Sequence, residues 1–202
     1  MKKITLTIFV IFILVTGFFL LRPKNNPEIR NQVTSENIIP EVKEKSEYVL
    51  PVKNFKEGIT KKPFGIYITP KNSPVAPEKF QGFHTGVDIE ETQGEIIPVL
   101  AIADGEVIYS GWVVGYGGVL GLKIDKYLVL YGHLNADTIP KVGTKVVRGQ
   151  QLGYLGKGNT KETDFERQHL HFGILKSGRF DLRGYVQSQN DLENWLNPAN
   201  FF

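Results

Sequence analysis

The segment "RQHLHFGIL", residues 167–175, places two histidines one residue apart in an otherwise apolar run. Successive side chains of a β-strand point to opposite faces, so we expect His169 and His171 to share one face and Leu170 and Phe172 the other. The apolar face predicts burial in a sheet. Two imidazoles on one face can bind a metal or relay a proton, or they can be two exposed polar positions on a half-solvated sheet. The rest of the chain has to decide between these readings.

Short β-branched and aromatic runs alternate with Gly, Pro, Asn and Asp from Leu50 onward. They predict strands at residues 97–103, 105–114, 120–125, 127–134, 145–156 and 170–176. No segment shows a long helical period, so residues 50–202 are predicted to form a mostly β, antiparallel domain. The final stretch "DLENWLNPANFF" predicts a short helical turn that Asp191 would cap and Pro198 would end.

The N-terminus carries Lys2 and Lys3 and then an uncharged apolar stretch from Ile4 to Leu21. This stretch is long enough to span a bilayer, so residues 1–22 are predicted to be a transmembrane anchor, with a cleaved signal peptide as the alternative. Residues 23–49 are polar and predict a flexible linker. The protein is therefore expected in the cell membrane as a single-pass protein with its domain on the extracytoplasmic side, or secreted if the segment is cleaved.

Composition removes several classes of function. The 202 residues carry a net charge of +3 and no Lys/Arg-rich run with interleaved aromatics, so nucleic acid is not an expected partner. Cysteine is absent, which excludes disulfides, a thiol nucleophile and thiolate ligands. A metal site in this chain would have to use histidine and carboxylate.

The other two of the four histidines lie in similarly informative places. The segment "GFHTGVDIE" (82–90) separates His84 and Asp88 by four residues, which puts them on one face of an extended chain. His133 ends the apolar run "YLVLYGHL" (127–134), just before a polar turn, where functional groups are often found. Each of these residues taken alone has an ordinary structural interpretation.

Taken together and in order, these segments resemble the LytM/lysostaphin-type zinc metallopeptidases, which cut peptide bonds in bacterial peptidoglycan. The segments "PVLAIADGEVIYSG" (98–111) and "VGTKVVRGQQLGYLG" (142–156) extend the resemblance. It implies antiparallel β-sheets that form a groove, in a duplicated hybrid motif-like domain. It also implies that one Zn²⁺ ion is held by His84, Asp88 and His171, that His133 and His169 are catalytic, and that no other cofactor is bound.

Two imidazoles and one carboxylate leave zinc a fourth position for water, which is typical of a catalytic site. Either His133 or His169 can then act as the base. The predicted function is a zinc endopeptidase that acts on peptidoglycan cross-links or stem peptides. One alternative is an inactive peptidoglycan-binding regulator that activates a separate wall amidase, although this chain keeps all five residues that the resemblance assigns. Another is a zinc hydrolase that cuts a different wall amide. Peptidoglycan, the membrane and an unknown protein activator are the expected partners.

Two segments depart from the family pattern. The loop at 157–168 is longer and more charged than the resemblance implies, and it is expected to border the groove. The Pro-rich stretch 61–83 could line the groove, fold over it as an inhibitory lid, or be an ordinary surface loop. Glu90 and Glu91 are expected to be solvated turn positions.

Overall fold

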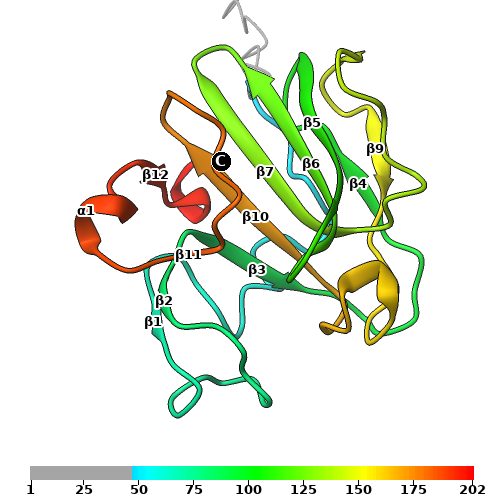
Figure 1. Ribbon diagram of the computed structural model, residues 1–202. Coiled ribbons are helices and arrows are strands. Elements are labelled where there is room, and N and C mark those ends of the chain that lie inside the picture. The colour runs from blue at the N-terminus through cyan, green and yellow to red at the C-terminus, as the bar shows by residue number, and fades with distance from the viewer. Residues whose placement is uncertain (1–46) are drawn as a thin grey trace, which may run out of the picture. The chain divides into compact units, whose positions relative to one another are not determined.

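Long antiparallel strands form the main sheet of the computed structural model, which describes residues 47–202 (Figure 1). Seven strands make up this sheet, in the order β12-β10-β7-β6-β5-β8, with β3 also paired to β10. Its strands are β3 (Gly86–Glu90), β5 (Gly105–Val113), β6 (Gly117–Ile124), β7 (Tyr127–Leu134), β8 (Lys145–Val146), β10 (His169–Leu175) and β12 (Trp195–Leu196). Every pairing is antiparallel, so the predicted mostly β, antiparallel class is confirmed.

Strand β10 is hydrogen-bonded along both edges. β7 lies on one edge, while β3 lies on the other beside His169 to Gly173. β12 continues that second edge beside Ile174 and Leu175. All residues of β10 are buried, so the strand is held from both sides and its side chains have fixed directions.

The two faces of β10 differ as the sequence predicts. Leu170, Phe172 and Ile174 are 0% exposed and belong to the main hydrophobic core. The ring of Phe172 packs edge-on against the ring of Tyr131, with centroids 5.2 Å apart. Each such buried side chain contributes roughly 1.5–3 kcal/mol. The histidines of β10 therefore lie on the face away from this core.

Two smaller sheets complete the strand arrangement in the part of the chain that the structure describes. One consists of β1 (Tyr67–Ile68), β2 (Gly82–His84) and β11 (Tyr185–Val186), and the other of β4 (Pro98–Leu100) and β9 (Gln151–Tyr154). Only Thr85 separates β2 from β3, so the chain passes from one sheet to another between His84 and Asp88. The sequence pattern does not predict β1, β2, β3, β11 or β12, because these strands are short and their sequences lack a long apolar alternation.

Within residues 47–202, helical structure is limited to η1 (Lys161–Thr163), α1 (Gln189–Leu192) and η2 (Pro198–Asn200). The predicted cap of the C-terminal turn is wrong, because the Ser188 hydroxyl accepts the backbone N–H of Asp191 and Asp191 lies inside α1. Pro198 begins η2 rather than ending a helix. A first helical turn tolerates proline because its missing N–H would have no partner there in any case.

The predicted anchor at residues 1–22 and nearly all of the predicted linker at 23–49 lie outside the described residues. Within residues 47–202, no helix has the length and apolar character that a bilayer span requires. The end of the predicted linker is bonded to the folded part, since the N–H of Val49 donates to the carbonyl of Ile102 at 2.9 Å. The predicted domain boundaries stay a prediction.

Candidate metal centre and active site

His84, Asp88 and His171 bring three potential ligand atoms together. His84 ends β2, while Asp88 of β3 lies directly opposite His171 of β10 in the strand register. His84 Nε2 is 3.0 Å from His171 Nδ1, and both nitrogens are 3.1 Å from Asp88 Oδ1. The three residues are buried, and within the described part of the chain they are identified as a group that could hold a metal ion. They are also the three residues for which the sequence predicts metal binding.

This donor set fits zinc. The three atoms form a nearly equilateral triangle with sides of 3.0, 3.1 and 3.1 Å. Ligand atoms around a tetrahedral zinc ion at about 2.0–2.1 Å lie about 3.3 Å apart, so a small expansion would seat the ion. His84 Nδ1 lies 3.2 Å from the carbonyl of Pro63. A carbonyl only accepts, so Nδ1 carries the proton and the lone pair of Nε2 faces the triangle.

His169 and His133 lie beside this triangle. His169 Nδ1 is 2.9 Å from the carbonyl of Arg167, which leaves the lone pair of the neutral ring on Nε2. That Nε2 atom lies 3.3 Å from Asp88 Oδ2. The ring of His133 is 4.1 Å from the ring of His169, centroid to centroid, and its Nδ1 is buried without a hydrogen-bond partner among the described residues. The backbone of His133 is left-handed, with φ of 62°, which is uncommon for a residue other than glycine.

Burial and neighbouring charges set the protonation of the site. Burial alone would raise the pKa of Asp88, but the nearby His169 and His84 outweigh it and hold that pKa well below its usual range. Burial lowers the pKa of His171 to about 4, even though Asp88 acts in the opposite direction. Burial and the proximity of His169 lower the pKa of His133 well below its ordinary value. At neutral pH the Asp88 carboxylate is ionised and the His171 imidazole is neutral, as metal ligation requires. The His133 imidazole is neutral as well.

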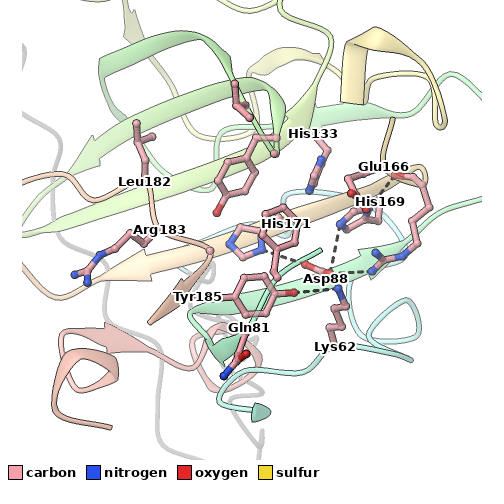
Figure 2. Close-up of a pocket in the computed structure, with 16 residues that line it drawn as sticks. Lys62, Gln81, Asp88, His133, Glu166, His169, His171, Leu182, Arg183 and Tyr185 are labelled. Atoms are coloured by element: carbon pink, nitrogen blue, oxygen red, sulfur yellow. Dashed lines mark hydrogen bonds and ion pairs between the residues drawn. The ribbon is translucent and has the colours of Figure 1, made fainter. Parts of the chain in front are cut away.

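A cavity of about 280 Å³ lies next to these residues. Figure 2 shows His133, His169, His171 and Asp88 among the side chains that surround it, with Tyr185 close to Asp88. Asp88 and His171 of the metal-binding group therefore line the same open space as His133 and His169, while His84 is fully buried and contacts Asp88 and His171. All five site residues predicted from the sequence are brought together.

The two segments that depart from the family pattern both contribute to the cavity wall. The stretch 61–83 supplies Lys62, Phe80 and Gln81, and the loop at 157–168 supplies Glu166 and Arg167. The first of the three alternatives for residues 61–83 is therefore supported, because this stretch lines the groove.

Specific contacts hold the two segments in place. Lys62 Nζ lies 2.6 Å from Glu78 Oε2, and both side chains are almost completely buried. The ring of Phe80 stacks on Tyr185 with centroids 5.5 Å apart. An ion pair of 3.0 Å between Lys79 and Glu166 joins one segment directly to the other.

Two site residues were missed from the sequence. Glu90 is not a solvated turn position, because β3 continues to Glu90 where it pairs with His169 of β10. The Glu90 side chain is 16% exposed and forms an ion pair with Arg167 at 2.7 Å. Arg167 is also 2.8 Å from Asp88. The two-residue spacing of Arg167, His169 and His171 is the signal that would have placed Arg167 on the face of the histidines.

Comparison with known proteins identifies the family. Residues 82–181 match the family model described as Peptidase family M23. The lipoprotein NlpD of Yersinia enterocolitica is 32% identical over 94 residues, which cover 46% of this chain and 89% of that protein. The chain belongs to peptidase family M23, which confirms the predicted resemblance to the LytM/lysostaphin-type enzymes.

Two further relatives have names that describe different functions, one an endopeptidase and the other an activator of hydrolases. The glycyl-glycine endopeptidase ALE-1 of Staphylococcus capitis is 35% identical over 94 residues, which cover 45% of this chain and 24% of that protein. The murein hydrolase activator EnvC of Escherichia coli is 35% identical over 82 residues, which cover 40% of this chain and 18% of that protein. This chain therefore spans less than a quarter of the length of these relatives. Among solved structures, LytU has 26% sequence identity and a TM-score of 0.50, with 71% of this chain and 83% of that chain covered.

Proposed function

We propose that this protein is a zinc-dependent endopeptidase that hydrolyses peptide bonds in the cross-links or stem peptides of peptidoglycan. The observation that carries the proposal is the convergence of His84 Nε2, Asp88 Oδ1 and His171 Nδ1 within 3.1 Å of one another, beside two further histidines. An enzyme of this type needs both a ligand set with an open position and a nearby base. The relative ALE-1, whose name describes an endopeptidase, supports the same class of reaction.

His84, Asp88 and His171 would hold the zinc ion. When bound, zinc activates water at neutral pH and polarises the carbonyl that is attacked. The residues of this chain supply the proton transfers. His169 is placed to accept a proton at Nε2, and the imidazolium so formed would be stabilised by Asp88 Oδ2 at 3.3 Å.

His133 would act with His169 rather than on the metal. Its ring lies 4.1 Å from His169 and its buried Nδ1 has no partner among the described residues, so it is available for a substrate group. The low pKa of His133 favours the neutral ring, which can donate a hydrogen bond from one nitrogen and accept one at the other. We therefore assign His169 as the base and His133 as the partner that orients the substrate.

Release of soluble peptides from purified peptidoglycan by the full-length chain tests this function. The proposal predicts release that a zinc chelator abolishes and added zinc restores. His169→Ala should release peptides about 10²- to 10⁴-fold more slowly while it still binds zinc. Release that persists in the presence of the chelator would contradict zinc dependence.

The relative EnvC favours a second candidate, a wall-binding activator of a separate amidase. An activator performs no hydrolysis itself. Its function would therefore not need the predicted ligands and bases, which are His84, Asp88, His133, His169 and His171. Adding the chain to a purified wall amidase and peptidoglycan separates the two candidates. An activator would stimulate the amidase and the His169→Ala variant would stimulate it equally, whereas the endopeptidase would release its own products without the amidase.

We also propose that residues 1–22 anchor the protein in the cell membrane and place the domain on the extracytoplasmic side. The apolar, uncharged stretch from Ile4 to Leu21 supports this location. Fractionation of cells that express the full-length chain tests it. The anchored form would stay with the membrane after a high-salt wash, and a cleaved form would appear in the medium with a shorter chain.

A further inference from the structure

We propose that Arg167 is a positioning residue that fixes how Asp88 faces the metal, an inference that rests on the proposed zinc site. The two oxygens of Asp88 have different surroundings. Oδ1 lies 3.1 Å from both His84 Nε2 and His171 Nδ1, inside the ligand triangle. Oδ2 lies 2.8 Å from Arg167 Nη2, outside the triangle. The guanidinium therefore holds one oxygen away and presents the other to the ion as a single ligand.

Arg167 is itself held in place. Its Nε lies 2.8 and 3.0 Å from the two carboxylate oxygens of Glu90, and its Nη2 lies 2.7 Å from Glu90 Oε1. Lys61 contacts the same carboxylate at 3.2 Å. The Arg167 side chain is 12% exposed, so little solvent competes for these bonds. A planar guanidinium with several fixed donors can bridge two carboxylates in this way, whereas a lysine ammonium is a single point charge.

The register between β3 and β10 explains how the side chain of Arg167 reaches Asp88. His171 lies opposite Asp88 and His169 lies opposite Glu90. Arg167 precedes this paired segment by two residues, on the same face as the histidines. Its long side chain extends diagonally back along β3, from Glu90 to Asp88.

The backbone of Arg167 acts on the second functional residue. Its carbonyl lies 2.9 Å from His169 Nδ1 and fixes that ring with its lone pair on Nε2. Arg167 therefore orients a metal ligand through its side chain and the proposed base through its main chain. A substitution at this position separates the two effects, because it changes the guanidinium and keeps the carbonyl.

A simpler role would be charge neutralisation of two nearby carboxylates. The two roles predict opposite results for metal binding. If Arg167 only supplies positive charge, its removal leaves the site more negative, and zinc should bind as tightly as before or more tightly. If Arg167 orients Asp88, its removal frees the carboxylate to turn, and zinc should bind more weakly.

The test compares the full-length parent chain with Arg167→Gln, Arg167→Lys and the exposed control Arg179→Gln, which removes the same charge away from the site. Zinc affinity is measured by competition with a chromophoric chelator. The visible spectrum of the cobalt-substituted protein reports the number of ligands. Thermal unfolding of the metal-free chains shows whether each variant folds.

We expect Arg167→Gln to lower zinc affinity by about 10- to 100-fold, the usual effect of removing a group that orients a metal ligand. Its cobalt spectrum should weaken, because Asp88 would then bind through both oxygens. Arg167→Lys should recover only part of the affinity, and Arg179→Gln should match the parent. Parental or tighter zinc binding by Arg167→Gln, or full recovery by Arg167→Lys, would overturn the positioning role. Because no arm measures hydrolysis, a parent chain that binds zinc but releases no peptides would contradict only the proposed function.

Discussion

His171 lies directly opposite Asp88 in the ladder between β10 and β3, and its Nδ1 atom is 3.1 Å from Asp88 Oδ1. The contact joins residues 83 positions apart in the sequence. The pairing of two strands therefore sets the geometry of the metal site. A one-residue shift of this register would separate His171 from Asp88 and would also turn the core side chains of β10 to the opposite face.

Substitution of a ligand and of a neighbouring histidine should have different effects. His171→Ala should lose both zinc and activity, because it removes one corner of the ligand triangle. His169→Ala should keep the zinc and lower kcat by about 10²–10⁴, the usual contribution of a general base. Metal analysis of the purified chains, together with peptide release from peptidoglycan, checks both outcomes. Loss of zinc from His169→Ala as complete as from His171→Ala would mean that the roles are divided wrongly.

Side chains on the core face of β10 should affect the stability of the fold and leave zinc affinity unchanged. Phe172→Ala should lower the free energy of unfolding by about 3–5 kcal/mol, because it leaves a cavity in the main core. Phe172 is 0% exposed and points away from His171. Denaturant unfolding gives the stability, and chelator competition under folding conditions gives the zinc affinity, which should stay within about threefold of the parent value. A selective loss of zinc at unchanged stability would contradict this separation of the two faces.

Gly86 should be required for the close approach of β3 and β10. A β-carbon at this position would meet the carbonyl oxygen of Phe172 and lie 3.1 Å from Cε1 of His171. Gly86→Ala should therefore cost about 1–3 kcal/mol of stability and weaken zinc binding as well. Gly111→Ala is the matched control in β5, where the nearest side-chain atom lies 3.6 Å from the added β-carbon. Equal stability and zinc affinity for the two variants would show that the contact between β3 and β10 has room for a β-carbon at residue 86.

The buried pair Lys62–Glu78 should make stability depend on pH. Burial alone would raise the pKa of Glu78, but hydrogen bonds from Lys62, Ser73 and the Phe80 backbone outweigh it and lower that pKa below its ordinary value. The ionised carboxylate therefore binds its proton less readily in the folded state than in the unfolded state. The stability that Glu78 contributes is complete above about pH 4.5 and is lost as pH falls through the lower pKa of the folded state.

Glu78→Gln should cost about 3 kcal/mol at pH 7, because it leaves the Lys62 ammonium buried without a carboxylate. The difference from the parent should shrink as the pH is lowered below 4.5, because Glu78 then becomes protonated in the unfolded parent while it is still ionised in the folded parent. Urea unfolding of both chains at a series of pH values measures this difference. A difference that is constant with pH would argue against the ion pair as its source.

The sequence was most informative where long strands are amphipathic or wholly apolar. The run at 127–134 matches β7, and the predicted strand at 170–176 is shifted by one residue at each end from β10. The alternation between Leu170 and His171 correctly predicted which side chains lie in the core. These features depend on local periodicity, which is present in the sequence itself.

Features that depend on distant pairing could not be predicted. β12 (Trp195–Leu196) is a strand only because it pairs with the end of β10. Glu90 was placed in a turn because its ion pair with Arg167 joins residues 77 positions apart. The metal ligands His84, Asp88 and His171 were predicted from the resemblance. The passage of the chain from one sheet to another at Thr85 was not predicted. Such contacts arise from tertiary structure and leave no local pattern.

The most direct test of the central claim is mass spectrometry of the products formed from purified peptidoglycan by the zinc-loaded full-length chain, in water labelled with heavy oxygen. We expect products with new amino termini and products with one labelled oxygen in the new carboxylate, and neither should form when a chelator removes the zinc. Fragments cut only between muramic acid and the stem peptide, or no fragments from a chain that holds its zinc, would contradict the assignment as an endopeptidase.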